Sequence, residues 1–241
     1  MSEKKKKILG VITARGGSKS ISGKNIKELG GKPLIAYTIE VAKRSNLISD
    51  LIVSTDDEKI LQVVKEYDVD VPFMRPKELA QDNTPHLPVM QHAISFMEKK
   101  LGDEFDYIVI LQPTSPFRIV KDIDKTIEKL INTGADSAVS LVEIEENHPA
   151  KMKRLEGDKV LPYFDGIVEG EMANRHNLPI VYKRSAAVYA MKRDLTMKEG
   201  KIFGDYIVGH IVPKERSIDI DNPFDWLKAE CMLNNLKGKQ K

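Results

Sequence analysis

Three short stretches of this chain carry polar and charged side chains at spacings suited to phosphate or metal chemistry. The first, residues 15–25, directly follows an apolar run and contains three glycines. It offers Arg15, Lys19 and Lys24 as cations, and these together with backbone N–H groups suit a chain of phosphates. The glycine spacing matches neither a Walker A loop nor a dinucleotide-binding fingerprint. The structural alternative is an ordinary polar turn between a strand and a helix.

The second stretch is Asp219-Ile220-Asp221. If residues 216–219 continue an extended segment, side chains two apart point to the same side, so both carboxylates face one point while Ile218 and Ile220 face the core. Two hard oxygen ligands with room for phosphate oxygens are what Mg²⁺ prefers. The alternative is that Asp221 caps the final helix and Asp219 is merely exposed.

The third stretch, residues 112–118, reads Gln-Pro-Thr-Ser-Pro-Phe-Arg and follows an apolar run. Ligands prefer the carboxyl end of a buried strand in such sheets. Pro113 and Pro116 stiffen this turn and fix the direction of the polar side chains. Those side chains are Gln112, Thr114, Ser115 and Arg118. The alternative is a stiff turn that only leads into a helix starting near Asp122.

Other polar residues favour structural roles. Asp56 and Asp57 are typical of a helix N-cap rather than of catalytic acids. The five histidines fall at no metal-binding spacing, and the chain shows no nucleophile elbow or Ser-His-Asp order.

The elements that must position these residues alternate along the chain. Bounded apolar runs predict buried strands, and apolar residues at helical spacing follow them. The predicted strands are residues 8–14, 51–54, 107–111 and 138–142, and the predicted helices begin near Pro33, Asp56, Val89 and Ile123. This alternation predicts an α/β fold with a mainly parallel sheet, helices on both faces, and a ligand site beyond the carboxyl ends of the strands.

The alternation breaks over about residues 143–185, which are rich in proline and glycine and show little periodicity. We interpret this stretch as an excursion from the sheet, either an arm for a partner subunit or a substrate lid. The sheet resumes with residues 186–191 and 207–212, and Pro223 opens a final helix. We expect one domain over residues 1–241 with this inserted excursion.

Composition narrows the class of protein. The 241 residues are 41% apolar, enough for one real core, and 38 basic against 36 acidic residues give no polyanion-binding character. Cys231 is the only cysteine, so no internal disulfide can form. The apolar start ends at Arg15 and is too short for a membrane span. We therefore expect a cytoplasmic protein that binds neither nucleic acid nor membrane.

Taken in order, these motifs resemble those of the acylneuraminate cytidylyltransferases, also called CMP-sialic acid synthetases. The resemblance runs from about Ile8 to Leu236. The motifs that carry it are Arg15-Gly-Gly-Ser-Lys with Lys24-Asn25, Ser54-Thr55-Asp56, Arg75-Pro76, Leu111-Gln112-Pro113-Thr114-Ser115-Pro116, Arg175 with Leu178-Pro179, and Asp219-Ile-Asp221.

The resemblance implies a Rossmann-like nucleotidyltransferase that transfers CMP from CTP to the anomeric hydroxyl of a nonulosonic acid, an acidic nine-carbon sugar, and releases pyrophosphate. It implies catalytic roles for Arg15, Lys24, Asp219 and Asp221, the two aspartates holding Mg²⁺. The implied CTP site comprises Arg15, Gly16, Gly17, Ser18, Lys24, Asn25, Arg75 and Thr84. The implied sugar site comprises Gln112, Lys151, Arg175, Tyr189 and Phe203. It also implies a homodimer in which the excursion embraces the partner.

The chain departs from the family pattern mainly near the sugar. The substituted positions are Ser22 and Gly23 in the first loop, then His86, His176, Ser185-Ala186 and Ile202. Neuraminic, legionaminic and pseudaminic acids stay open as acceptors, and the general base is unassigned. The alternatives are a 3-deoxy-manno-octulosonate or other sugar nucleotidyltransferase of the same fold, and a catalytically silent nucleotide-binding module. A silent module would have no need of the metal pair.

Overall fold

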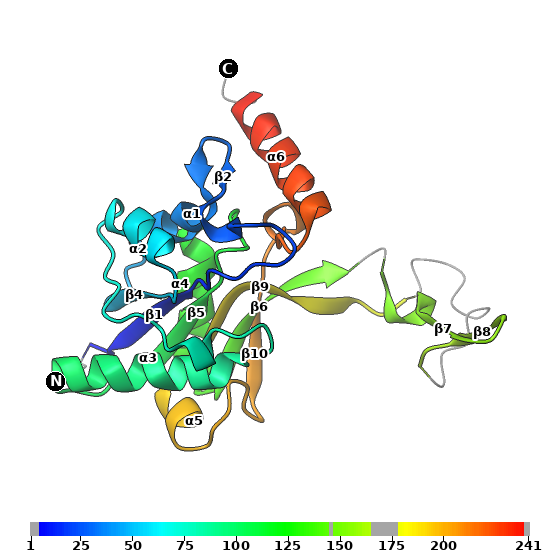
Figure 1. The fold of residues 1–241 in the computed structure, drawn as a ribbon. Helices are drawn as coiled ribbons and strands as arrows, with labels where there is room; N and C mark the ends of the chain where they lie inside the picture. The colour runs from blue at the N-terminus through cyan, green and yellow to red at the C-terminus, as the bar shows by residue number, and fades with distance from the viewer. Residues whose placement is uncertain (1–4, 145–146, 165–177, 239–241) are drawn as a thin grey trace.

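A mixed sheet forms the centre of the protein. The computed structural model describes residues 5–144, 147–164 and 178–238, and within them six strands pair in the order β10-β6-β9-β5-β1-β4 (Figure 1). Their bounds are β1 Ile8–Thr13, β4 Asp50–Ser54, β5 Tyr107–Leu111, β6 Ser137–Ile144, β9 Val181–Lys192 and β10 Ile207–Ile211. β9 is antiparallel to both its neighbours, and the other pairings are parallel. The predicted mainly parallel sheet is confirmed.

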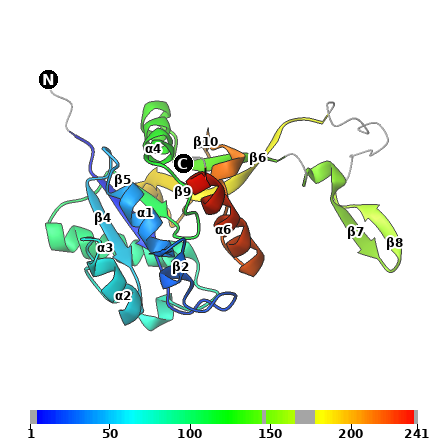
Figure 2. The same cartoon turned by 90° about the horizontal axis from the view of Figure 1, so that it is seen from above.

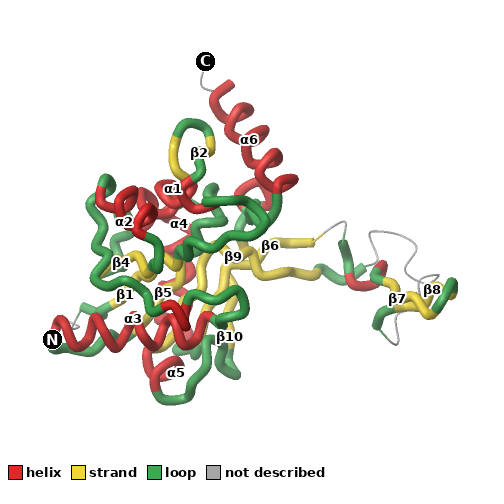
Figure 3. Tube along the Cα trace, in the orientation of Figure 1, coloured by secondary structure: helices red, strands yellow, loops and turns green. Residues whose placement is uncertain are grey.

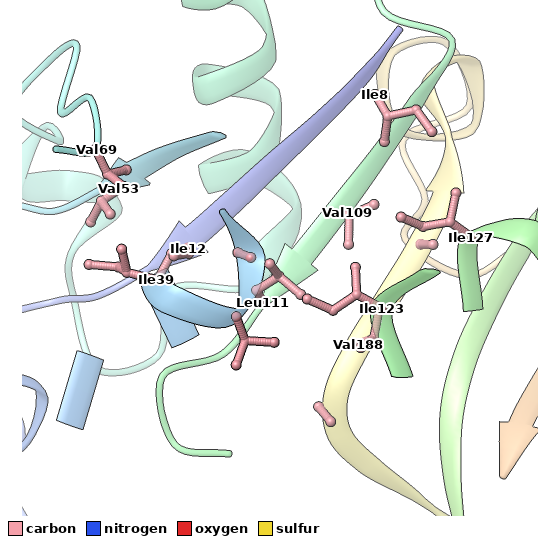
Figure 4. Close-up of a cluster of buried hydrophobic side chains, with 14 of the residues drawn as sticks. Ile8, Ile12, Ile39, Val53, Val69, Val109, Leu111, Ile123, Ile127 and Val188 are labelled. Atoms are coloured by element: carbon pink, nitrogen blue, oxygen red, sulfur yellow. The ribbon is translucent and has the colours of Figure 1, made fainter. Parts of the chain in front are cut away.

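Helices cover both faces of this sheet. One cluster of buried side chains joins it to α1 (Leu34–Ala42), α2 (Glu58–Lys65) and α4 (Val120–Thr133). Figure 4 shows part of this cluster, in which Ile39 of α1 and Ile123 and Ile127 of α4 pack against strand residues. A second cluster joins the other face to α3 (His86–Leu101) and α5 (Arg193–Met197). Strands β1 and β5 are apolar throughout because both of their faces are buried.

The ends of the helices follow from local sequence. The Asp57 side chain caps α2 by accepting from the N–H groups of Lys59 and Ile60, as predicted. Gly102 ends α3 and Gly134 ends α4, both in the left-handed conformation that a glycine adopts without steric cost.

A third cluster attaches the C-terminal helix α6 (Pro223–Gly238) to the body. It joins Trp226 and Ile220 to Leu29 and Leu34, which lie in and after the small β2–β3 hairpin (Glu28–Leu29 and Lys32–Pro33). Short 3₁₀ turns connect the remaining segments. They are η1 Lys24–Ile26, η2 Lys77–Leu79 and η5 Lys214–Arg216.

The insertion projects from the body between β6 and β9. The ends of these strands pair as far as Ile144 and Val181, and they lead to η3 (Pro149–Lys151) and the hairpin β7 (Lys153–Glu156) and β8 (Lys159–Pro162). In Figures 1 and 2 this hairpin lies away from the sheet. β9 begins at Val181 rather than near residue 186, because its first residues belong to the projecting ribbon.

The base of the insertion is held by His148, which is buried. Its Nδ1 accepts from the Ala150 N–H at 3.1 Å, so Nε2 carries the proton and donates to the Pro179 carbonyl at 3.0 Å. This contact ties the chain after β6 to the chain before β9. Separately, among the described residues no helix is long and apolar enough to cross a membrane.

Candidate active site

A cleft of about 250 Å³ opens beyond the carboxyl ends of β1 and β5. Figure 3 draws the loops in green, and the long loop after β1 and the segment before α3 border this region. The cleft brings together seven of the predicted site residues from four separate segments. They are Arg15, Ser18, Lys24, Asn25, Arg75, Thr84 and Gln112.

The loop of residues 15–25 takes its shape from the junction between β4 and α2. The Gly16 N–H donates to Asp56 Oδ1 at 3.0 Å, and the Ser18 N–H donates to the Gly16 carbonyl at 3.0 Å. A Cβ atom on Gly16 would lie 2.4 Å from Asp57 Oδ2, so only glycine fits there. Three N–H groups of the loop, those of Gly16, Ser18 and Lys24, already donate to acceptors of the protein, so they are not free to bind an anion.

Lys24 links this loop to the carboxylate segment. Its side chain is 12% exposed, and its Nζ donates to the Ile220 carbonyl at 2.7 Å and lies 3.6 Å from Asp221 Oδ1. The backbone of Arg15 is held by Asn25, whose Nδ2 donates to the Arg15 carbonyl at 3.0 Å. At the mouth of the cleft, the Arg15 and Lys19 side chains both pair with Asp82.

Arg75 enters the cleft from a buried position, with 6% of its surface exposed. Its N–H donates to the Thr55 carbonyl at 2.7 Å, and its guanidinium donates to the Ser54 hydroxyl at 3.0 Å and to the Ser54 carbonyl. Burial lowers the pKa of Arg75 to about 10, so the side chain stays cationic at neutral pH. These contacts to the end of β4 therefore fix the Arg75 guanidinium at one side of the cleft.

Residues 112–118 divide between the cleft and the core. Gln112 and Thr114 line the cleft, whereas Arg118 is buried behind them and donates to the carbonyls of Gln112 and Ala187 at 2.7 and 2.6 Å. It also donates to the Thr38 hydroxyl at 3.0 Å. Burial lowers the pKa of Arg118 to about 9. The stretch is thus both a stiffened turn and a carrier of site residues.

Asp219 and Asp221 line a second hollow of about 340 Å³, together with Lys183 and Asp225. The predicted extended segment is wrong, because η5 ends at Arg216 and residues 217–221 are irregular. The Ile220 N–H donates to the Thr114 carbonyl at 2.8 Å, so backbone contact to the neighbouring turn replaces strand pairing. As predicted, Ile220 faces the core.

Neither structural alternative for the two aspartates holds. The α6 helix is capped by Asn222, whose Oδ1 accepts from the N–H groups of Phe224 and Asp225 at 2.9 and 3.1 Å. Asp221 is 71% exposed at its side chain and makes no cap. Asp219 Oδ1, by contrast, is buried and has no hydrogen-bond partner of normal geometry among the described residues.

The electrostatics of Asp219 fit a cation. Burial raises its pKa and the neighbouring Asp221 carboxylate raises it further, whereas the Thr114 hydroxyl and Lys24 oppose this. An orphaned carboxylate oxygen beside a second carboxylate is a suitable donor set for Mg²⁺. Over the described residues no group of three or more His, Cys, Asp or Glu could hold a metal ion.

The predicted sugar-binding residues that the structure describes fall into three places, and Gln112 lines the cleft. Tyr189 and Phe203 pack edge to face with ring centroids 5.8 Å apart, and the Arg184 guanidinium lies 4.6 Å from the Phe203 ring centroid. Burial raises the pKa of Tyr189. Lys151 is exposed and ends η3 in the insertion, which Figures 1 and 2 show projecting from the body, and it is not among the residues that line the cleft. Arg175 lies outside the described residues.

Sequence reasoning missed several polar residues that the structure places at these hollows, among them Asp82, Gln81 and Lys183. Asp82 and Gln81 line the cleft, and Lys183 lies with the two aspartates. Asp82 and Gln81 sit in an aperiodic loop, so no spacing marked them. Lys183 belongs to the exposed first part of β9, where residues 182–184 show no alternation that could have marked it.

A mainly parallel sheet whose carboxyl edge carries clustered cations beside two carboxylates is the arrangement of a nucleotide-dependent transferase. A family model described as cytidylyltransferase matches residues 9–206. The chain therefore belongs to the cytidylyltransferase family and is a nucleotidyltransferase. This confirms the family predicted from the sequence motifs.

Characterised relatives are similar over nearly the whole chain. The chain is 30% identical to post-translational flagellin modification protein B of Campylobacter coli, covering 96% of this chain and 98% of that one. It is 32% identical to a CMP-N,N'-diacetyllegionaminic acid synthase of Legionella pneumophila, covering 94% and 96%. It is also 32% identical to an N-acylneuraminate cytidylyltransferase of Escherichia coli, covering 98% of this chain but only 54% of that protein.

Among solved structures, the fold is similar to CMP:2-keto-3-deoxy-manno-octonic acid synthetase complexed with CTP. The TM-score is 0.70 at 18% identity, over 95% of this chain and 99% of that one. At this identity the likeness concerns the fold alone.

Proposed function

We propose that the protein transfers CMP from CTP to the anomeric hydroxyl of a nonulosonic acid and releases pyrophosphate. The observation that carries this proposal is the convergence of Arg15, Lys24 and Arg75 on one cleft beside Asp219 and Asp221. The names of relatives about 30% identical support the acceptor class, since they include neuraminic, legionaminic and pseudaminic acid enzymes.

The reaction requires the acceptor hydroxyl to attack the α-phosphorus of CTP while pyrophosphate leaves in line. Arg15 and Lys24 lie where a triphosphate would meet them, and their charges would offset the negative charge that develops on the leaving pyrophosphate. Lys24 is fixed by the Ile220 carbonyl, so it needs little reorganisation during the reaction. Arg75 would bind the base, because its guanidinium is fixed against Ser54 and can present donors to cytosine.

Asp219 and Asp221 would hold Mg²⁺. When bound, the ion would neutralise phosphate charge and polarise the reacting phosphoryl group. Asp219 would contribute its orphaned Oδ1 and Asp221 its exposed carboxylate, with Lys24 limiting their mutual repulsion. The general base stays unassigned.

We propose that the sugar lies towards Gln112, Tyr189 and Phe203, and that its carboxylate is bound by Lys151 and Arg175 of a partner subunit in a homodimer. The support for a partner is spatial. Lys151 lies on the projecting insertion rather than at the cleft of its own chain. A bidentate arginine contact would favour acidic sugars over neutral ones. A cytoplasmic location, where CTP is made, stays a prediction.

The nearest rival is a 3-deoxy-manno-octulosonate cytidylyltransferase, whose fold this chain shares at 18% identity. The relatives of higher identity favour the nine-carbon acceptors. The test is pyrophosphate release from CTP and Mg²⁺ with a panel containing neuraminic, legionaminic, pseudaminic and 3-deoxy-manno-octulosonic acids. Turnover with the eight-carbon acid alone would refute the proposed acceptor, and equal turnover of CTP and ATP would refute the role of Arg75.

A further inference from the structure

In the free protein, the Asp82 carboxylate pairs with two cations of the loop of residues 15–25. Its Oδ1 contacts Arg15 Nη1 and its Oδ2 contacts Lys19 Nζ, so each carboxylate oxygen holds one cation. Asp82 comes from the loop between η2 and α3, across the cleft from residues 15–25, and it lines the same cleft. Hydrogen bonds from Lys19 and Arg15 lower the pKa of Asp82, so it is anionic at neutral pH.

The contact conflicts with nucleotide binding. The Arg15 and Lys19 groups that point at Asp82 cannot use the same N–H bonds for phosphate oxygens. A polyphosphate that enters the cleft must therefore displace the Asp82 carboxylate or lie beside it against like-charge repulsion. The contact is also reversible, because the side chains of Asp82 and Lys19 are 40% and 82% exposed and such ion pairs are weak.

We propose that Asp82 is an internal competitor for the polyphosphate subsite, which it fills between turnovers and from which it helps to release pyrophosphate. This inference rests on the proposed function, in which Arg15 binds the phosphates of CTP, and it adds Lys19, the second cation that pairs with Asp82, to that subsite. A competing internal state lowers the apparent affinity of a ligand by the fraction of molecules in which the site is free. This loss of apparent affinity applies to every ligand that binds Arg15 and Lys19. A ligand that does not reach these two residues keeps its affinity.

The test is the substitution Asp82→Asn, which keeps the shape of the side chain and removes its charge. We expect the Kd of CTP and of inorganic tripolyphosphate, measured by calorimetry, to fall roughly 3- to 10-fold, the range expected for two exposed ion pairs. The Kd of CMP should change less than about two-fold, because CMP lacks the outer phosphates. Product inhibition by pyrophosphate should strengthen by the same factor as CTP binding.

Glu78→Gln is the matched control. Glu78 is an exposed acidic residue on η2 in the same segment, and within the described part of the chain it makes no ion pair. Its substitution removes the same net charge without freeing Arg15 or Lys19, so the three Kd values should stay near those of the parent. In a Lys19→Ala background, the gain from Asp82→Asn should shrink, since one of the two pairs is already absent.

Weaker or unchanged binding of CTP and tripolyphosphate by Asp82→Asn would show that Asp82 only orders the cations, and would overturn the proposal. Equal tightening of CMP, or equal tightening by Glu78→Gln, would reduce the effect to net charge and overturn it too. Asp82→Ser serves as a second variant if the asparagine protein does not fold. A parent protein that binds tripolyphosphate but not CTP would contradict the proposed nucleotide, while tripolyphosphate would still decide the role of Asp82.

Discussion

The burial of Asp219 lowers the stability of the free protein. Its Oδ1 has lost contact with water and gains no hydrogen bond of normal geometry from the described residues in return. Burial accordingly raises its pKa, which means that the native state binds a proton more readily than the unfolded chain. The free energy of unfolding therefore falls as the pH rises through the native pKa of Asp219. Above that pKa this loss of stability is complete. A bound cation would remove this penalty.

We therefore predict opposite effects of Asp219→Asn on activity and stability. Turnover should fall by on the order of 10²-fold or more, because a metal ligand is lost. Without Mg²⁺ at neutral pH, the Tm should equal or exceed that of the parent, and the difference should vanish as the pH falls through the pKa of Asp219. Activity assays and thermal unfolding across pH measure the two effects.

Asp221→Asn is the control for this prediction. Its side chain is 71% exposed and its charge is only one of the causes that raise the pKa of Asp219, so the Tm should rise less than in Asp219→Asn although turnover should still fall. Near-normal activity of either variant at limiting Mg²⁺ would show that the metal assignment is wrong.

The two cations of the first loop give a second prediction. Arg15→Ala and Lys24→Ala should each lower kcat/KM for CTP by on the order of 10²-fold, since each removes a charge-assisted contact that strengthens as charge develops on the phosphates. Lys59→Ala, an exposed lysine at the start of α2, is the control and should be neutral. Steady-state kinetics with CTP varied would decide, and a loss confined to the sugar KM would exclude the phosphate role.

At the scale of elements, α4 and the carboxylate segment are joined by one ion pair. Asp122 is 1% exposed and accepts from Arg216 at 2.7 and 3.2 Å and from the Ile119 N–H at 3.1 Å. Arg216 ends the turn that leads into Asp219 and Asp221. The start of α4 therefore fixes where the proposed metal ligands lie.

We predict that Arg216→Ala lowers the free energy of unfolding by about 2 kcal/mol, because it leaves the buried Asp122 carboxylate without its main partner. The value is below that of a fully buried pair, since the Arg216 side chain is 29% exposed. The Mg²⁺ concentration for half-maximal activity should also rise. Urea unfolding and metal titration measure these effects, and the double variant with Asp122→Asn should lose less stability than the sum of the single losses. An additive double variant would argue against the pair.

Elements whose pattern is set by burial were predictable from the sequence. β1, β5 and the helices that cover them follow from apolar runs and helical spacing, because both faces of those strands are buried. The direction of β9 was not predictable, since an apolar run fits parallel and antiparallel pairing alike. The segment of residues 216–219 was predicted as extended because alternation resembles a strand, although Arg216 ends a 3₁₀ turn and the Ile220 N–H donates to the Thr114 carbonyl and not to a strand.

The same distinction holds within the candidate site. The cations and carboxylates of the site belong to sequence motifs, so their residue types and their order along the chain made them candidates. Asp82 could not be predicted, because its importance comes only from loop packing that brings it across the cleft to Arg15.

At the scale of the molecule, the projecting insertion carries several exposed apolar side chains. Leu155, Val160 and Ile180 are 71%, 61% and 67% exposed. Surfaces of this kind mark protein interfaces, and two-fold pairing with a second copy would bury them. In the proposed homodimer, Lys151 of one copy would lie at the cleft of the other.

We predict that light scattering at micromolar concentration reports about twice the chain mass of 27.2 kDa. A sharper test mixes two inactive proteins, Lys151→Ala and Asp219→Asn. If the insertion completes the partner's site, a mixed dimer contains one site with both residues intact and one with both altered. Random mixing should then restore about a quarter of the parent activity. If Lys151 acts in its own chain, every site in the mixture stays defective and no activity returns. A stable, fully active monomer would exclude the arrangement altogether.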